Sequence, residues 1–598
     1  MSIADLQKVT LCGLMTEKQD VLRGLQDLGC MHLLPLRPPP AEVEKVASPR
    51  AEAAYKALRF LTDEPQKRRQ VVRDAQFNVE KVVEAALDLK QRLRDATDQR
   101  DFLKNRIAQI EPWGDIVFPP NEALAGYRLW FYVLPLSKIG DLDRVDLPWK
   151  IVRKDNRFAY VALISQTEPP SDLMPVPRTH VGALPSKELK SQLEDVEVKL
   201  EDLTAQRQAL TRYIYLLSVN IAEAENRASL AYADQQTRDD DAIVAVQGWV
   251  PVDEVSYVEA YAKNKNLACI IEDPGPNDNP PTLIEQPADM DAGVDLAMFY
   301  QVPYYRSWDP SLVLFASFSI FFAMILADAG YGLLLMIGLL AFWRRLGESE
   351  KGRAYRVLGL ALFGSTIVYG VMVGSYFGIS PPEGSLLDRL HLFSVNDFDT
   401  MMKLSIIIGV LHIVLANSMA AYANRSKLVA ISNLGWIAAL FGGLLLWLAE
   451  PGSVWKSVSI VLLVAGLFAV LLFASNRPVK QPTDHLWRLL DGIGSLTGVM
   501  GAFGDVLSYM RLFALGLASA SLAGTFNGLA SSVHNELPGL GLLAAILILG
   551  IGHGLNLGLS LMSGVVHGLR LNFIEFYKWG LPEEGTPFRK FARKEVQP

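Results

Sequence analysis

Arg511 is the residue of this sequence whose type and position most directly imply chemistry. It lies inside the apolar stretch GDVLSYMRLFALGLASASLAG, which covers residues 504–524 and is long enough for a membrane span. A guanidinium cannot become neutral by losing its proton, so within a bilayer it needs an ionic partner or a water-filled cavity. We therefore predict that Arg511 acts in ion translocation. The alternative is a structural ion pair with Asp328 or Asp505, and both carboxylates are kept as candidate site residues.

Polar residues in the last apolar stretch form a second candidate site. They recur at alternating intervals of three and four residues, which places all of them on one face of a helix: His553, Asn556, Ser560, Ser563, His567 and Arg570. Such a stripe, with two imidazoles and a cation, predicts an aqueous path or a proton relay. As alternatives, the serines and the asparagine can hydrogen-bond neighbouring helices, and Arg570 can extend to the membrane interface.

These residues must be positioned by membrane helices, and apolar windows of about 20 residues predict eight of them. The expected spans are near 312–326, 329–343, 356–378, 403–422, 429–449, 457–474, 493–530 and 540–574. An even number of spans returns both termini to the same side. The last two stretches exceed the length of a simple crossing, so we expect two long, tilted helices there.

The distribution of charge predicts the orientation. Three connections on one face carry most of the basic residues of this region: Arg344, Arg345, Lys351, Arg353, Arg356, Arg425, Lys427, Arg477, Lys480 and Arg488. By the positive-inside rule that face, the N-terminal half and the C-terminal tail are expected in the cytoplasm. The net charge of −7 and the lack of a basic tract argue against a nucleic-acid partner.

The N-terminal half has the pattern of a water-soluble domain with a long stalk. Heptad-like seams predict an antiparallel coiled-coil hairpin of residues 50–112 with 187–232. Short β-type runs predict two α/β lobes, one from residues 1–40 with 240–275 and one from residues 115–182, both built from βαβ pieces. The expected division is therefore a domain of residues 1–305, a membrane domain of residues 306–578 and a tail of residues 579–598.

No enzyme-like site is expected in the soluble half. Its sequence shows no Gly-rich phosphate loop and no nucleophile elbow, and its three cysteines have no metal-ligand spacing. We therefore expect a non-catalytic chain with no cofactor and no bound metal. The fold class predicted is an α+β soluble domain with a long coiled coil, followed by an all-α membrane domain.

Several motifs, in their order along essentially the whole chain, resemble one family. They are GWVP at Gly248–Pro251, PPTL at Pro280–Leu283, FFAMILADAGYGLLL at Phe321–Leu335, VGSYFG at Val373–Gly378, SYMRLFALGLA around Arg511 and HGLRLNFIEF around Arg570. The chain is similar to the a subunit, or subunit I, of V-type and A-type rotary ATPases. Any one motif is weak, but their combination is specific.

The resemblance implies a stator that couples ATP hydrolysis or synthesis to proton or sodium translocation through two half-channels. It assigns the stator arginine to Arg511 and a second one to Arg570. The partners implied are a rotating proteolipid c-ring, the E and G subunits of the peripheral stalk, the d/C subunit of the central stalk and the lipid bilayer. The chain lacks the long insertions of eukaryotic relatives, which favours the plasma membrane of a prokaryote.

Two positions depart from the family pattern, and two other functions remain open. Some relatives have a histidine where Ser519 stands and a glutamate where Ser560 stands, so no proton-relay role is carried over to either from the resemblance. A secondary ion transporter would also carry buried charges, but it would be expected to show an internal repeat. A membrane scaffold or sensor would explain the coiled coil but not Arg511.

Overall fold

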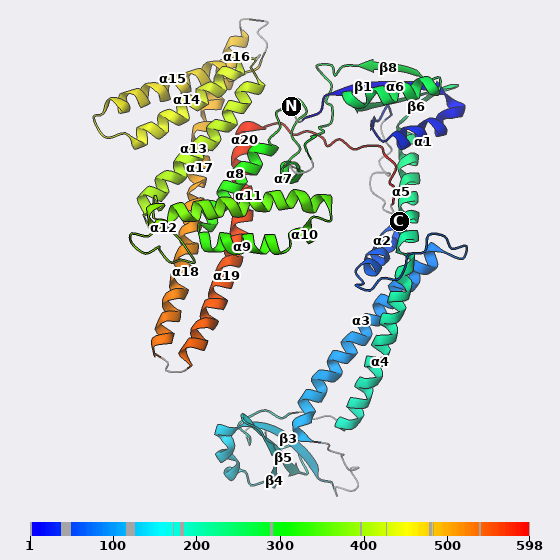
Figure 1. Cartoon of the computed structure of the whole chain (residues 1–598), viewed down its shortest axis with the longest axis vertical. Coiled ribbons are helices and arrows are strands. Elements are labelled where there is room, and N and C mark those ends of the chain that lie inside the picture. The colour runs from blue at the N-terminus through cyan, green and yellow to red at the C-terminus, as the bar shows by residue number, and fades with distance from the viewer. Residues whose placement is uncertain are drawn as a thin grey trace. The chain divides into compact units, whose positions relative to one another are not determined.

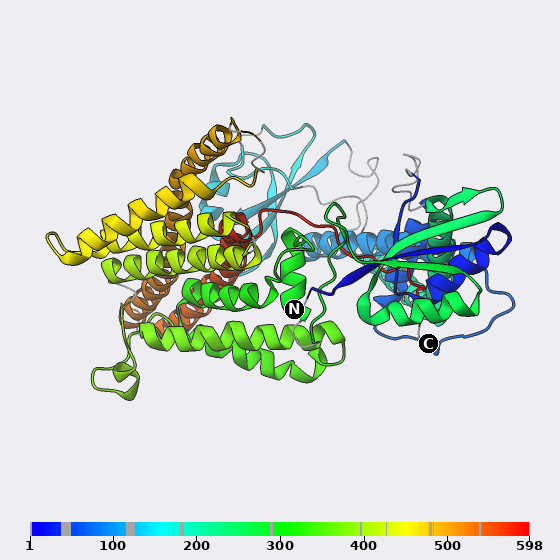
Figure 2. The ribbon, with the colours of Figure 1, turned by 90° about the horizontal axis from the view of Figure 1, so that it is seen from above.

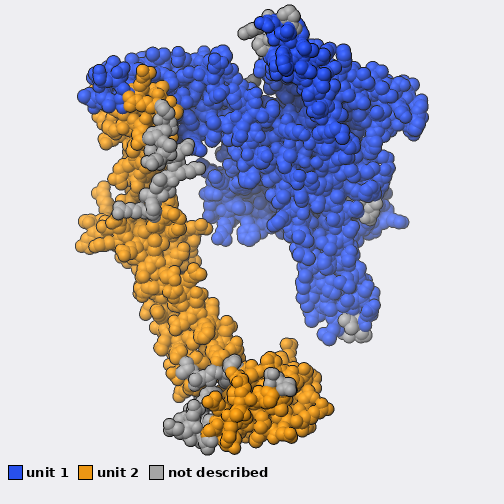
Figure 3. Space-filling view, turned by 180° about the vertical axis from the view of Figure 1, so that it is seen from behind, with its two compact units in different colours: residues 1–16, 30–34, 239–591 blue, residues 17–29, 35–238, 592–598 orange. Residues whose placement is uncertain are grey.

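The structure is a computed structural model of the whole chain, which forms two compact units (Figure 3). It describes residues 3–37, 49–114, 126–170, 173–179, 185–287, 291–394, 397–425, 427–477, 481, 483–536 and 540–596. Unit 1 comprises Met1–Thr16, Cys30–Leu34 and Asp239–Phe591, and unit 2 comprises Glu17–Gly29, Pro35–Arg238 and Ala592–Pro598. Parts of the predicted segments 1–40, 115–182 and 579–598, and Lys480, lie outside the described residues.

Unit 1 contains a sheet that joins the start of the chain to residues far along it. Its main strands are β1 (Leu6–Leu14), β2 (His32–Leu34), β7 (Ile243–Pro251) and β8 (Ala268–Glu272), in the order β2-β7-β1-β8. All neighbours are antiparallel, and Val9 of β1 lies opposite Gly248 of β7. The pair β1 and β2 therefore runs in one direction with β7 between them, which is the split βαβ arrangement. The expected βαβ pieces occur in this split form.

Two short elements complete this region of the sheet. The strand β6 (Arg238–Asp240) pairs with β7, and helix α6 (Val255–Asn264) connects β7 to β8. Gly248 lies against the chain beside it, because a Cβ there would lie 2.5 Å from the carbonyl oxygen of His32. The GWVP motif therefore marks a position where the backbone of β2 approaches closely.

Unit 2 is built on long helices. They are α1 (Lys18–Leu28), α2 (Pro49–Thr62), α3 (Val79–Ile110), α4 (Ser186–Leu210) and α5 (Ile214–Gln236). The side chain of Asn78 caps α3 by accepting a hydrogen bond from the Lys81 amide at 3.1 Å. Helices α3 and α4 lie side by side (Figure 1), with buried contacts that include Leu103, Val196 and Leu203. The heptad positions of the two sequence segments therefore meet along this pair.

The far end of the α3–α4 pair carries a second, smaller sheet. Strands β3 (Arg128–Pro135), β4 (Trp149–Lys154) and β5 (Phe158–Ser165) have the order β3-β5-β4 and are all antiparallel. A 3-10 helix, Leu136–Arg144, follows β3, and no α-helix occurs in the described residues between β3 and β5. Strands β3 and β4 therefore run in the same direction on either side of β5, and the 3-10 helix takes the place of the α-helix of the expected βαβ unit.

Six helices of unit 1 are long and apolar enough to cross a membrane, among the described residues. They are α11 (Glu350–Val373), α13 (Phe398–Ala423), α14 (Val429–Leu448), α15 (Val454–Phe473) and two composite helices, Thr483–Glu536 and Gly541–Gly580. The first two expected spans are shorter apolar helices, α8 (Ser311–Leu326) and α9 (Ala329–Ala341). The count of eight crossings therefore stays a prediction. Helices α14 and α15 run side by side in both ribbon views (Figures 1 and 2).

Short helices connect these elements. They are α7 (Asp291–Tyr300), α10 (Trp343–Leu346) and α12 (Leu386–Arg389). Helix α9 follows α8 after only two residues, Ala327, which adopts the left-handed conformation with a φ of 48°, and Asp328, which caps α9. The carbonyl groups at the end of α8 and the amides at the start of α9 therefore meet at one turn.

The two composite helices are interrupted rather than continuous. The first consists of α16 (Thr483–Leu496), α17 (Gly498–Ser508) and α18 (Met510–Glu536). The second consists of α19 (Gly541–Arg570), a π-helix at Leu571–Phe576 and α20 (Tyr577–Gly580). With 54 and 40 residues, both are much longer than the roughly 20 residues of one crossing. Helices α18 and α19 lie side by side (Figure 1) and carry most of the candidate site residues.

Candidate functional site

Arg511 is the second residue of α18 and follows the interruption between α17 and α18. The interruption is held by Tyr509, which is fully buried and whose hydroxyl lies 2.8 Å from Nδ1 of His412 on α13. Arg511 is half-buried, and its Nη1 atom has no hydrogen-bond partner among the described residues. Arg570 and Glu575 are close enough to act on it electrostatically. The interruption of the backbone therefore positions this cation. Arg511 forms no ion pair with a described residue.

The first carboxylate considered as a partner for Arg511 is engaged elsewhere. Asp328 is 3% exposed and caps α9 by accepting from the Tyr331 amide at 3.0 Å. Its two oxygens also accept from the Ser375 hydroxyl at 2.7 Å and from the amides of Phe377 and Gly378, both at 2.9 Å. Four donors therefore saturate this carboxylate, which holds the turn after α11 against the start of α9. Its participation in ion transfer stays a prediction.

The second carboxylate, Asp505 on α17, forms an ion pair with a different residue. Its Oδ2 atom lies 2.7 Å from Nζ of Lys578 and accepts from the indole of Trp579 at 2.8 Å. Lys578 remains about half exposed, whereas the Asp505 side chain is mostly covered. The alternative of an Arg511 ion pair with Asp328 or Asp505 is therefore wrong for this structure.

A continuous group of hydrogen bonds joins α9, α18 and α19. The Tyr331 hydroxyl lies 2.7 Å from Nδ1 of His553 and accepts from Nδ2 of Asn556 at 3.1 Å. Nε2 of His553 lies 3.0 Å from Oδ1 of Asn527, whose amide nitrogen donates to the carbonyl of Phe377 at 2.8 Å. The Asp328 turn and the first half of the polar stripe are thus linked through Phe377 and Asn527.

Two serines extend this group along the α18–α19 contact. Asn556 is 1% exposed and donates to the carbonyl of Ser519 at 2.9 Å. The Ser560 hydroxyl donates to the Ser519 hydroxyl at 2.9 Å. These are hydrogen bonds between helices, as the alternative reading of the stripe supposes. We refer to the whole group, Tyr331, Ser519, Asn527, His553, Asn556 and Ser560, as the Tyr331 network.

The second half of the stripe has a different environment. Ser563 and His567 are half-buried, and Arg570 is exposed. The Nδ1 atom of His567 has no hydrogen-bond partner among the described residues, and Arg511 and Arg570 both act on this imidazole electrostatically. The six residues therefore share one helix, but only His553, Asn556 and Ser560 are bonded within the Tyr331 network.

Aromatic packing covers α19 beside the second half of the stripe. Next to Ser563 and His567, Gly564 and Gly568 are buried against Phe322 and Phe318 of α8. A Cβ on Gly564 would lie 2.8 Å from the Phe322 ring, and one on Gly568 would lie 3.3 Å from the Phe318 ring. These two glycines therefore let the rings contact α19 directly, where a larger residue would not fit.

Three important residues were missed in the sequence analysis. Glu575, in the π-helix, is 2% exposed and its Oε2 atom is unpartnered among the described residues. Tyr331 joins His553 to Asn556, and His412 holds Tyr509. The sequence did carry a signal for Glu575, since it is a charged residue in an apolar run, as Arg511 is. The roles of Tyr331 and His412 depend on contacts across helices and had no local signal.

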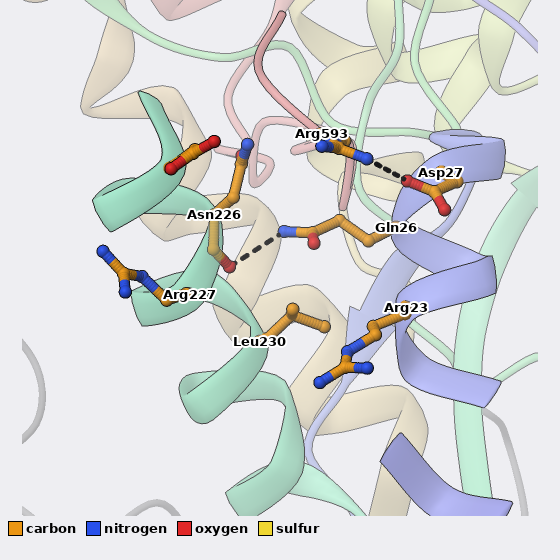
Figure 4. Close-up of a pocket in the computed structure, with 8 residues that line it drawn as sticks. Arg23, Gln26, Asp27, Asn226, Arg227, Leu230 and Arg593 are labelled. Carbon is orange, nitrogen blue, oxygen red and sulfur yellow. Dashed lines mark hydrogen bonds and ion pairs between the residues drawn. The ribbon is translucent and has the colours of Figure 1, made fainter. Parts of the chain in front are cut away.

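Unit 2 has a small hollow of about 270 Å³ beside the C-terminal tail (Figure 4). Asn226 of α5 holds the tail with two bonds, accepting from the Lys594 amide at 2.9 Å and donating to its carbonyl at 3.1 Å. Arg593 pairs with Asp27 of α1 at 3.5 Å. The charges nearby are largely paired, and no cluster of three or more His, Cys, Asp or Glu in the described ranges could hold a metal ion. The hollow therefore surrounds a docked tail.

One charged contact of the tail has a resolved effect on ionisation. Burial opposes ionisation of the Glu225 carboxyl, but Lys594 at 2.8 Å and the Tyr55 hydroxyl together hold its pKa below the ordinary value. Glu225 is consequently ionised around neutral pH and attracts the tail.

Comparison with known proteins gives relatives of one kind. The "V-type ATP synthase subunit I" of Chlamydia pneumoniae is 25% identical over 617 residues, covering 91% of this chain and 88% of its own length. The "A-type ATP synthase subunit I" of Methanocaldococcus jannaschii is 26% identical over 453 residues, covering 67% of this chain and 63% of its own length. No family model matches the chain.

A solved structure is also similar, the crystal structure of the cytoplasmic N-terminal domain of subunit I, homolog of subunit a, of V-ATPase. It is 16% identical and covers 44% of this chain and 99% of its own, with a TM-score of 0.21, which is too low to support an argument about architecture. The sequence relatives confirm the resemblance that the motifs indicate: over most of its length this chain is homologous to subunit I of the V-type and A-type ATP synthases.

Proposed function

We propose that this chain is the membrane stator of a V/A-type rotary ATPase and forms two ion half-channels against a rotating proteolipid ring. It binds no nucleotide in this proposal, and it couples rotation to the movement of protons or sodium ions. The observation that carries the proposal is Arg511, a half-buried cation without an ion-pair partner in the described residues, on a helix otherwise suited to lipid. A permanent charge at such a position is expected to be functional.

The environment of Arg511 supports two separate paths. The Tyr331 network lies on one side of it along α19, and Asp505, Glu575 and Lys578 lie on the other. The rings of Phe318 and Phe322 pack against α19 at Gly568 and Gly564, which lie between Ser560 and Glu575 along the chain. Two paths that do not meet are required, because a continuous path would let ions cross without rotation.

The exposed face of α18 suits a close helical partner. Gly504 on α17 and Ala514 and Ala518 on α18 are exposed on the Arg511 side. Among the described residues, no atom outside the backbone of its own helix lies within 4 Å of where a Cβ of Gly504 would be. On α19, the positions at Gly550, Gly554 and Gly558 are equally open. Small residues allow helices to approach closely, so this surface is where we place the ring.

The mechanism follows from the energy of charge in lipid. A carboxyl on the ring must be neutral while it faces lipid, because a bare charge there costs at least several kcal/mol. Beside Arg511 the ionised form is favoured, so the ring site gives up its ion into one path. After rotation it is refilled from the other path. Each charge that crosses 100 mV corresponds to about 2.3 kcal/mol, so several ions must move for each ATP.

The remaining parts are assigned by the same homology. We propose that the α3–α4 pair and its end sheet bind the peripheral-stalk E and G subunits and the central-stalk d/C subunit. We also propose that both termini lie in the cytoplasm of a prokaryotic cell, which the basic connections favour by the positive-inside rule, with eight crossings if α8 and α9 each span the bilayer. The second candidate, a secondary transporter, has no specific observation in its favour.

Cysteine labelling tests the two paths. In a variant without Cys12, Cys30 and Cys269, single cysteines at Asn527 and Ser508 should react with a membrane-impermeant thiol reagent from opposite sides of the membrane. Leu559 is 53% exposed on α19, away from the stripe, and its cysteine should stay unlabelled from both sides as the matched control. Labelling of Asn527 and Ser508 positions from the same side, or of neither, would contradict the half-channels.

A further inference from the structure

Polar residues on α17, α18 and the end of the last composite helix face each other in steps of three. Asp505 pairs with Lys578 at 2.7 Å. About one turn further along both helical segments, Ser508 and Glu575 interact. The Ser508 hydroxyl also donates to the carbonyl of Gly504 at 3.0 Å. A further step along α18 is Arg511, which acts electrostatically on Glu575. Glu575 therefore lies between the partly exposed Asp505–Lys578 pair and Arg511.

Glu575 is buried without full compensation of its charge. It is 2% exposed, and its Oε2 atom lacks a hydrogen-bond partner among the described residues. No ion pair of Glu575 with Arg511 or Arg570 occurs in this part of the chain. An unpaired buried carboxylate costs several kcal/mol, so a purely structural role would be expensive. An unpartnered buried oxygen of this kind marks a place where water or a proton can be bound.

The local backbone explains why Glu575 is in this position. The residues around it, Leu571–Phe576, form a π-helix, which is rare and is often found at functional sites. Leu571 packs in one apolar cluster with Tyr509 and Leu512, whereas Phe573 and Phe576 pack in another with Leu314. Apolar packing on both sides thus fixes the π-helix and leaves Glu575 as its acidic residue.

We propose that Glu575 is the proton-exchanging carboxyl of the path between Arg511 and the Asp505–Lys578 surface. This inference rests on the proposed function. In one direction, the O–H bond of a protonated ring carboxyl breaks beside Arg511, and a new O–H bond forms at Oε2 of Glu575. That bond then breaks, and the proton passes to water at Asp505 and Lys578. The ring carboxylate is left ionised, Glu575 returns to its ionised state, and the reverse direction follows the same steps.

The test uses the intact complex in inverted vesicles with the variant Glu575→Gln, which keeps the shape of the side chain but cannot exchange a proton. ATP-driven proton uptake should fall at least about a hundredfold, the lower end of the range expected for loss of a proton-transfer group, while the complex stays assembled. Glu583→Gln, at an exposed residue of the C-terminal tail, should leave uptake unchanged. Normal proton uptake in Glu575→Gln would overturn the proposal. ATP-driven uptake of sodium ions in place of protons would overturn it too.

A pH profile distinguishes proton exchange from a structural role. Glu575→Asp keeps a carboxyl but shifts its position, so the dependence of the transport rate on the pH at the Asp505–Lys578 side should change. If Glu575→Gln does not assemble, this variant decides the question, and an unaltered profile counts against proton exchange. Arg511→Gln in the same membranes separates the two proposals. Loss of transport in Arg511→Gln with a normal Glu575→Gln removes only this inference, whereas normal transport in Arg511→Gln removes the proposed function.

Discussion

The hydroxyl of Ser560 on α19 donates a hydrogen bond of 2.9 Å to the hydroxyl of Ser519 on α18. From the family resemblance, these are the two positions at which some relatives are expected to carry glutamate and histidine. Because the two side chains are in contact and are 5% and 6% exposed, the two departures form a single paired change. By that resemblance, a neutral Ser–Ser bond stands here where some relatives would have two titratable groups, and His553 is the imidazole of the Tyr331 network.

The pair should therefore behave as a unit under mutation. Ser560→Glu alone places an unpaired carboxyl at a buried site and should lower the amount of assembled complex. Adding Ser519→His should recover it, with a coupling of about 1 kcal/mol or more between the two sites in thermal unfolding of the complex. Ser519→His combined with Ser563→Glu is the control. Equal recovery in the control would show that the two positions are not coupled.

We predict that Asp328 is needed for the stability of the complex and not directly for ion transfer. Asp328→Asn offers one oxygen and an amide donor to four hydrogen-bond donors, so it should destabilise the complex by about 3 kcal/mol, the scale of one lost hydrogen bond to a charged group. Phe377, held at a φ of 53° by this carboxylate, should become accessible to protease.

The control for Asp328 is Asp388→Asn, which removes a half-buried carboxylate that accepts from the Gly384 amide at 2.9 Å. Transport divided by the amount of folded complex should be normal in Asp328→Asn if its role is structural. Reduced transport in a complex of normal thermal stability would instead assign Asp328 to ion transfer.

Local patterns in the sequence predicted the elements, and contacts between distant elements decided the site. The heptad repeats of residues 79–110 and 189–210 coincide with α3 and α4, because a periodic apolar face is encoded locally. The polar stripe on α19 is likewise a matter of spacing. Which of its residues would be bonded could not be predicted, since His553 and Tyr331 are 222 positions apart.

Backbone irregularities were the other limit. The interruption at Tyr509 positions Arg511, and the π-helix at Leu571–Phe576 positions Glu575. Neither irregularity contains a proline or a glycine pair from which it could have been predicted. Both are stabilised by packing against α13, through His412 and the rings of Tyr509 and Phe576. Apolar length alone could only show that these helices were too long for a simple crossing.

The contact between the tail at Arg589 and His32 should weaken at acidic pH. Nδ1 of His32 accepts from the Arg589 amide at 2.8 Å, which requires the neutral ring, and burial together with the charge of Arg589 lowers the pKa of His32. The unfolded chain titrates at its ordinary value of 6.5, so the contribution is complete above that pH. It is lost as the pH falls from there through the lowered pKa.

Limited proteolysis after Lys590 measures this effect in the intact complex. Cleavage should increase between about pH 7.5 and about pH 5.5 in the wild type. His32→Asn supplies an oxygen that accepts without titrating, so its cleavage should change less with pH. The same pH dependence in both proteins would mean that His32 does not control the tail.

The α3–α4 pair depends on its most deeply buried leucine. Leu203 is 1% exposed and packs with Leu89 and Ala96, so Leu203→Asp should destabilise the pair by at least about 3 kcal/mol. Hydrogen exchange of residues 79–110 should rise, and stalk subunits should dissociate in detergent. Phe102→Asp, at a residue 66% exposed on α3, is the matched control. Slow exchange and a whole complex in Leu203→Asp would contradict the role of the pair as an attachment site.

ATP-driven ion uptake into vesicles that contain the Arg511→Gln complex is the most direct measurement of the central claim. The side chain is only half-buried and has no ion-pair partner among the described residues, so the variant should assemble normally. Uptake should be abolished, and Arg511→Lys should restore little, because an ammonium group can lose its proton in a poorly hydrated site. Uptake at the wild-type rate in a fully assembled Arg511→Gln complex would contradict the account.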